Sequence, residues 1–163
     1  MPDRAGSGDE GTAMLEIIYD IAPGAELAFC GPATSLEMID CVNDLADVFG
    51  ADIIVDDLGF YDEPYFEDGP VALAVKAILP NRVYVSAAGN DGKKHYTGNF
   101  IGSNTLGLTK DGVPVSEHNF GLASGGAADP TLDVTVGPGA TIRIFLQWND
   151  PFGGSANDYD LHF

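Results

Sequence analysis

The chain has 163 residues, 45% of them hydrophobic, which is enough to bury the core of one domain or slightly more. Its 25 acidic residues against 7 basic ones give a formal net charge of −18. This balance argues against nucleic acid as a partner, because phosphate binding needs clustered lysine and arginine. No apolar run reaches the roughly 20 residues of a membrane helix, so we expect no membrane partner either.

The first part of the chain alternates between helical and extended patterns. Apolar residues at helical spacing predict helices over residues 11–22, 34–49 and 69–79, and short apolar runs predict strands over residues 26–30, 52–55 and 82–87. Short connections between them favour parallel strands joined by right-handed crossovers. The strand runs do not alternate with polar residues, so we expect helices on both faces of the sheet.

Several residues mark the ends of these helices. Residues 34–37 (TSLE) have the pattern of a capping box, which opens a helix. Gly50 is a natural helix terminator, and Pro70 suits a first helical turn. The two cysteines, Cys30 and Cys41, lack metal-type spacing, so we expect two buried free thiols. Spacing alone does not decide whether they form a disulfide.

The pattern changes after about residue 104. Residues 132–136 (LDVTV) and 141–148 (TIRIFLQW) alternate between apolar and polar, with a Gly-Pro-Gly turn between them, and residues 158–161 read as a further strand. One hairpin and one extra strand bury little core. We therefore predict an α/β domain with a parallel sheet over residues 1–104, followed by a truncated antiparallel β-sandwich segment over residues 105–163.

The most informative segment lies at residues 83–92 (VYVSAAGNDG), which read as a buried strand ending in a tight turn. In an open α/β sheet, ligands bind at the edge where such strands end. The amide of Asn90, held rigidly there, is a good donor to a developing oxyanion. The alternative is an Asn-Asp-Gly turn without any catalytic role.

Four segments, in this order and spacing, resemble the subtilisin-like serine peptidases (the S8/S53 superfamily). They are residues 10–12 (EGT) at a helix start, 22–27 (APGAEL), 50–55 (GADIIV) and 86–90 (SAAGN). The resemblance implies the parallel-sheet fold of that family and a serine endopeptidase that hydrolyses peptide bonds through an acyl-enzyme. It also implies a peptide or protein substrate, no required cofactor, and an extracellular or periplasmic location. The N-terminus has no apolar segment typical of a signal peptide.

The chain departs from the family at three places. Glu10 stands where the family has its catalytic histidine, the aspartate strand that should precede it is missing, and no Gly-Thr-Ser nucleophile motif follows. A serine peptidase needs a nucleophile, a base and an orienting acid. We therefore interpret this chain as an incomplete fragment, inactive by itself, with the remainder of the peptidase domain missing from it.

The resemblance assigns roles to individual residues. Asn90 would be the oxyanion donor, and Glu10 the general base or its relic, since the sedolisin branch uses glutamate there. Sedolisins carry an aspartate four residues further on, where this chain has Met14. Glu10 could instead be a helix-capping acid. The substrate-binding positions would be Asp57, Leu58 and Gly59, through backbone pairing with extended substrate, and Ser86, Ala87, Ala88 and Gly89. Residues 57–59 could also be a plain exit from the strand.

Two acidic segments suggest further binding. Residues 61–68 (YDEPYFED) could wall a substrate pocket that prefers basic side chains, or could cap the sheet edge. The C-terminal Asp150, Asn157, Asp158 and Asp160 supply oxygen ligands that suit Ca²⁺, although Asx-type turns around Pro151 and Gly153-Gly154 are the better explanation.

A rival function from another class remains open. The chain could be a non-catalytic, subtilase-like secreted binding or adhesion module that uses its acidic β segment and Ca²⁺. The glutamate in place of histidine favours this rival, whereas Asn90 and Gly59 favour the enzyme.

Overall fold

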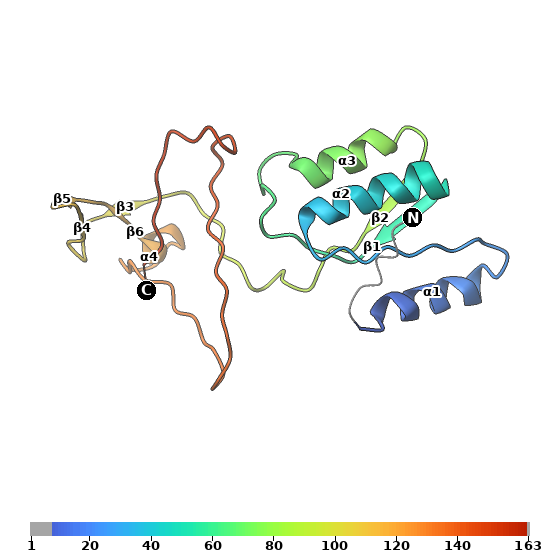
Figure 1. Cartoon of the computed structure of the whole chain (residues 1–163). Helices are drawn as coiled ribbons and strands as arrows, with labels where there is room; N and C mark the ends of the chain where they lie inside the picture. The colour runs from blue at the N-terminus through green and yellow to red at the C-terminus, as the bar shows by residue number, and fades with distance from the viewer. Residues whose placement is uncertain (1–7, 163) are drawn as a thin grey trace. The chain divides into compact units, whose positions relative to one another are not determined.

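The computed structural model describes residues 8–162, which divide into two compact units. Residues up to Gly89, together with the segment from Phe145 onward, form one unit, called here the α/β unit. Asn90–Ile144 form the second unit. The chain is thus mixed α/β, as expected (Figure 1). The boundaries between the units fall after residues 89 and 144 of the sequence, and not near residue 104.

The α/β unit contains the predicted alternation of helices and strands. Its elements in chain order are α1 (Glu10–Ile21), α2 (Ser35–Asn43), the π-helical η1 (Asp44–Phe49), β1 (Ile53–Asp56), α3 (Pro70–Ile78) and β2 (Val83–Ser86). The two strands pair in parallel, with Ile53 opposite Val83 and Asp56 opposite Ser86. The predicted parallel pairing is therefore confirmed for β1 and β2. The strand predicted over residues 26–30 is wrong, because that segment is irregular in the structure.

The predicted helix ends are confirmed. The Thr34 hydroxyl oxygen accepts a hydrogen bond from the Glu37 backbone N–H at 3.2 Å, and the Glu37 carboxylate accepts one from Ala33 N–H at 2.7 Å. These bonds satisfy N–H groups at the start of α2 that have no partner within the helix. Gly50 ends η1 in the left-handed conformation, at φ 80°, which glycine adopts without steric cost.

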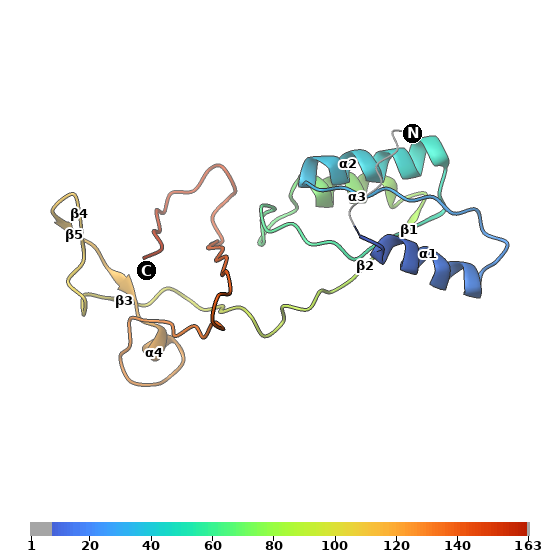
Figure 2. The ribbon, with the colours of Figure 1, turned by 60° about the horizontal axis from the view of Figure 1, so that its bottom comes forward.

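The core of the α/β unit lies between the strands and the pair α2 and α3, which run side by side (Figure 2). Its buried side chains are Met38, Val42, Ala46, Ile54 and Ile78. On the other face of the strands, Ile53, Val55, Val83 and Val85 are 43–62% exposed. Helix α1 lies on that side in the figures, but it has no buried residue. The expectation that helices cover both faces is therefore met on one face only, within the described residues.

A disulfide joins Cys30 and Cys41, whose Cα atoms are 5.7 Å apart. The expectation of two free thiols is wrong. Cys41 is 2% exposed on the packed side of α2, and Cys30 lies in the irregular segment between α1 and α2. The bond therefore fixes that segment to the core helix, which the weak packing of α1 does not do.

The predicted β-sandwich strands over residues 132–136, 141–148 and 158–161 are also wrong, because these segments are extended without strand pairing. Leu132, Val134 and Val136 are each about half exposed. An alternating pattern specifies a strand only where a surface receives its apolar side, and none of the described residues supplies one here.

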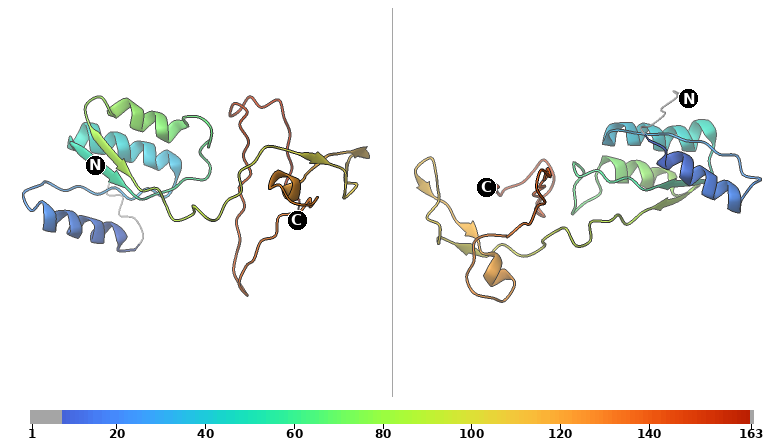
Figure 3. Two further views of the ribbon diagram at one scale, coloured as in Figure 1. Left: turned by 180° about the vertical axis from the view of Figure 1, so that it is seen from behind. Right: turned by 90° about the horizontal axis from the view of Figure 1, so that it is seen from below.

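The second unit is instead a small antiparallel structure (Figure 3). Strands β4 (Thr109–Lys110) and β5 (Val113–Pro114) form a hairpin, nested inside the pair β3 (Gly102–Ser103) and β6 (Glu117–His118). The hairpin turn has Asp111 at φ 53° and Gly112 at φ 78°. Positive φ at both central residues is the geometry that an Asp-Gly turn favours. The short helix α4 (Phe120–Ala123) follows.

Candidate functional site

The predicted substrate-binding residues meet at one edge of the parallel strands. Asp56 pairs with Ser86, and Ala87 N–H donates to the Asp56 carbonyl at 3.0 Å, so residues 57–59 and 87–89 leave the strands side by side. No atom lies within 4 Å of where a Cβ would stand on Gly59 or Gly89. Backbone of another chain can therefore approach this edge closely.

Asp56, which the sequence did not single out, organises this edge. Its carboxylate accepts hydrogen bonds from the Ser86 hydroxyl at 3.0 Å and from Leu58 N–H at 3.2 Å. The Tyr84 hydroxyl also hydrogen-bonds to this carboxylate. Burial of Tyr84, and after it the hydrogen bond to Asp56 and the negative charge of Asp56, raise the pKa of Tyr84. Tyr84 and Ser86 are two residues apart on β2 and so share a face. That alternation, read against a parallel β1, was the signal that could have revealed Asp56.

A hollow of about 650 Å³ opens beside this edge. Asp56, Tyr84 and Ser86 of the strands line it, together with the face of α3 and the loop over residues 58–69. The acids Glu63, Glu67 and Asp68 contribute negative charge, and Lys76 is the basic group of the lining. Its volume lies in the range of sites that bind small ligands or side chains.

The loop around this hollow is held by bonds at both ends. The Glu63 carboxylate accepts a hydrogen bond at 3.0 Å from Val71 N–H in the first turn of α3, where a negative charge also complements the helix dipole. The Gln147 amide donates to the Glu63 carbonyl at 2.8 Å and accepts from Tyr65 N–H at 2.9 Å. Phe145 stacks on Tyr61, with ring centroids 4.8 Å apart. The returning C-terminal segment thus clamps the acidic loop.

Replacing Gln147 by alanine is expected to loosen this loop, because the carbonyl of Glu63 and the N–H of Tyr65 lose their partner. The loss is about 1–2 kcal/mol in local stability. Hydrogen exchange at the Tyr65 amide should accelerate, and Asn149→Ala, two residues along the same segment, should leave it unchanged. Equal exchange rates in Q147A and the unmodified protein would contradict the clamp.

Glu10, the proposed base, is the first residue of α1 and is exposed. In Figures 1 and 2 the start of α1 lies at the end of the unit where β2 stops. The Phe29 ring packs against Gly11, at a spot where a Cβ would overlap it. A carboxylate at a helix N-terminus is favoured by the helix dipole. This position suits both a catalytic base and a helix-capping acid.

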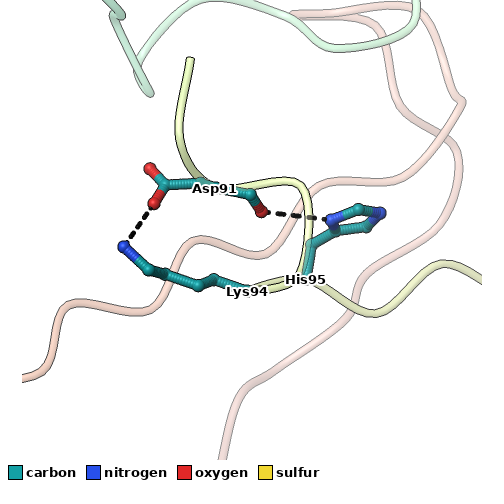
Figure 4. A network of polar contacts seen from close by, with 3 residues as sticks. All are labelled: Asp91, Lys94 and His95. Carbon is teal, nitrogen blue, oxygen red and sulfur yellow. Dashed lines mark hydrogen bonds and ion pairs between the residues drawn. The ribbon is translucent and has the colours of Figure 1, made fainter.

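Asn90, the proposed oxyanion donor, directly follows Gly89 and opens the second unit. It is exposed, and a turn follows it, as the sequence predicted. In this turn the Asp91 carbonyl accepts a hydrogen bond from Lys94 N–H at 2.9 Å, and the Lys94 ammonium pairs with the Asp91 carboxylate at 2.6 Å (Figure 4). This turn is compatible with both interpretations of Asn90, as an oxyanion donor and as a turn residue.

The candidate calcium ligands lie in a loop that closes on itself. One Asp150 carboxylate oxygen accepts hydrogen bonds from the Ser155 hydroxyl at 2.7 Å and from the Asn157 side-chain amide at 2.8 Å. It also accepts them from the Ala156 and Asn157 N–H groups. These hydrogen bonds lower the pKa of Asp150, and the bond from Ser155 has the largest effect. Among the described residues, no group of three or more His, Cys, Asp or Glu side chains that could hold a metal ion is found.

Comparisons of this chain with protein-family models, with curated proteins and with solved structures give no match. Within the described part of the chain, the helices are too short or too polar for a membrane span. The functional argument therefore rests on the chain's own residues and their geometry.

Proposed function

We propose that this chain is part of a subtilisin-like serine endopeptidase whose nucleophilic serine is supplied by a segment outside it. The observation that supports this most is the in-register parallel pairing of β1 and β2. This pairing brings residues 57–59 and 86–89, which the resemblance assigns to substrate, to one edge. The whole of α3 separates these two segments in the sequence, and the strand pairing brings them together.

The proposed chemistry follows from this edge. An extended substrate adds as a strand along residues 57–59, where Gly59 leaves room for its backbone. The Asn90 amide donates to the oxyanion of the tetrahedral intermediate. Glu10 accepts the serine proton, which a carboxylate does best at mildly acidic pH.

The hollow beside the edge favours a basic side chain in the substrate. Glu63, Glu67 and Asp68 contribute negative charge, while Val71 and Val75 of α3 offer apolar wall for an aliphatic stem. Long basic side chains combine such a stem with a charged head. Asp62, the other acid of residues 61–68, does not line this hollow. Its carboxylate accepts a hydrogen bond from the Ser35 hydroxyl at 2.7 Å.

The disulfide supports a location outside the reducing cytosol, because such bonds persist mainly in oxidising compartments. This agrees with the extracellular or periplasmic location that the resemblance implies.

Replacing Asn90 by alanine, in a protein that includes the serine-bearing segment, is expected to lower kcat about 10²–10³-fold. This range comes from a subtilisin, in which one oxyanion donor was removed. The exposed Asn81, after α3, gives the matched control Asn81→Ala, which should keep its activity. Turnover unchanged in N90A would remove the proposed role of this amide.

A non-catalytic binding module is the second candidate, because Glu10 replaces the expected histidine. A serine-reactive phosphonate separates the two functions. Covalent labelling of the longer protein supports the peptidase. Peptide binding at the 57–59 edge without any labelling supports the binding module.

A further inference from the structure

His118 occupies a position in the second unit where both ring nitrogens have partners. Its Nδ1 accepts a hydrogen bond from Ile101 N–H at 3.1 Å, and its Nε2 lies 2.8 Å from the Tyr96 hydroxyl. Ile101 directly precedes β3, and His118 is the last residue of β6. We propose that protonation of His118 opens the β3–β6 pair, so that the second unit unfolds in mild acid while the α/β unit stays folded.

The reason is a conflict between two protons. A backbone N–H always donates, so Nδ1 must keep its lone pair, and the neutral ring carries its proton on Nε2, toward Tyr96. The imidazolium ion carries a proton on Nδ1 as well, which would point directly at the Ile101 N–H. Protonation therefore breaks this bond and leaves the Ile101 N–H without a partner.

The broken bond lies at the end of the strand ladder. Asn119 N–H donates to the Ile101 carbonyl at 2.7 Å, directly after the paired residues Gly102 and His118. The peptide on either side of Ile101 is thus bound to residues 118 and 119. Pairs of two-residue strands have few other bonds to hold them, so the loss of one end weakens the whole pair.

Among the described residues, no carboxylate is hydrogen-bonded to either ring nitrogen of His118, where it could balance a positive charge. Its ring lies among Tyr96, Phe100 and Phe120, with centroids 4.5–5.6 Å away, and burial lowers the pKa of His118. The neighbouring Glu117 is 7% exposed and accepts hydrogen bonds from Ser103, Leu106 and Leu108.

The remaining acid near this cluster is Asp129, which follows α4. Its carboxylate accepts hydrogen bonds from the Thr131 hydroxyl and N–H, while its own N–H donates to the Asn119 side chain. The titratable groups around His118 are therefore Tyr96, Glu117 and Asp129. Both carboxylates are bound by donors of their own.

The direction of the pH effect follows from these shifts. The pKa of His118 lies below its ordinary value of 6.5, so below pH 6.5 the unfolded chain takes up a proton that the folded unit does not. Stability is then lost as the pH falls from 6.5 toward the folded pKa. Burial acts to raise the pKa of Glu117, but its hydrogen bonds outweigh burial and lower it below 4.5. Its contribution is lost at still lower pH.

His95 provides a matched control within the same unit. Its Nδ1 lies 3.4 Å from the Asp91 carbonyl oxygen, an acceptor that requires a proton on that nitrogen (Figure 4). Protonation of His95 therefore keeps its contact, whereas protonation of His118 breaks one.

The test is a pH titration of the full chain from 7.5 to 4.5, followed by NMR. We expect the His118 ring to titrate below pH 6.5. The protection factors of the Ile101 and Asn119 amides, which compare the measured exchange rate with the intrinsic rate at the same pH, should fall in the same step, with the opening constant rising by up to tenfold per pH unit, the limit for one proton. The Ala87 amide, bonded to Asp56 in the α/β unit, should keep its protection.

Two variants isolate the histidine. His118→Asn places an amide oxygen where Nδ1 accepts and does not titrate, so it should remove the step below pH 6.5. His95→Asn should keep this step. If H118N fails to fold, the unmodified chain decides. A His118 pKa at or above 6.5, as the aromatic rings would produce by attracting the imidazolium, overturns the proposal. Protection at Ile101 that persists after His118 is protonated also overturns it.

Discussion

Replacing Ile54 by alanine is expected to lower the free energy of unfolding of the α/β unit by about 2–5 kcal/mol. Ile54 is 4% exposed on β1 and packs with Met38 and Val42 of α2 and with Ile78 of α3. The truncation removes apolar contact at the centre of this cluster and leaves a cavity there. Urea denaturation followed by circular dichroism at 222 nm measures the loss.

The adjacent residue is the control. Ile53 is 62% exposed on the opposite face of β1, so Ile53→Ala should cost no more than about 0.5–1 kcal/mol. The two variants differ only in which face of one strand loses its side chain. Equal losses would contradict the assignment of the packed face, and with it the position of Asp56 in the hollow.

Removing the disulfide is expected to destabilise the α/β unit by about 3 kcal/mol. The bond closes a short loop and so lowers the conformational entropy of the unfolded chain, and its removal restores that entropy. The suitable variant combines Cys30→Ser with Cys41→Ala, because a serine at the buried position 41 would bury a hydroxyl. Thermal unfolding of this variant and of the reduced parent protein should agree.

The control is a count of thiols in the unfolded parent protein without reductant. The disulfide predicts none, because both cysteines are bonded to each other. Two reactive thiols under these conditions would contradict the bond.

The parts of the fold that the sequence predicted are those with strong local signals. Helix α2 begins with a capping box and α3 with a proline, both have an apolar stripe, and the strands β1 and β2 are short apolar runs. Gly50 gives the end of η1, which continues α2, without ambiguity. Local chemistry decides each of these features.

The parts that failed depend on contacts between distant residues. Residues 132–136 alternate like a strand, but strand formation needs a partner and a surface to cover. The disulfide required knowledge that residues 30 and 41 lie close in space. The Asp111-Gly112 hairpin is different, because its Asp-Gly turn is a local signal in the sequence.

The candidate site divides in the same way. Residues 57–59 and 86–89 could be placed at one edge from the order of the elements, since parallel neighbours end together. Asp56 required one further step, because its role arises from Tyr84 and Ser86, whose shared face on β2 places both beside it only once β1 is read as the parallel neighbour. Gln147 is separated from the loop it clamps by more than eighty residues.

That separation has a consequence for biosynthesis. Because the α/β unit is completed by the segment from Phe145 onward, the second unit is an insertion within it. A ribosome adding roughly 5–20 residues per second exposes the acidic loop for several seconds before Gln147 emerges. During this interval the loop lacks its partner Gln147, so proteolytic nicking of residues 61–68 should be most frequent before that residue emerges.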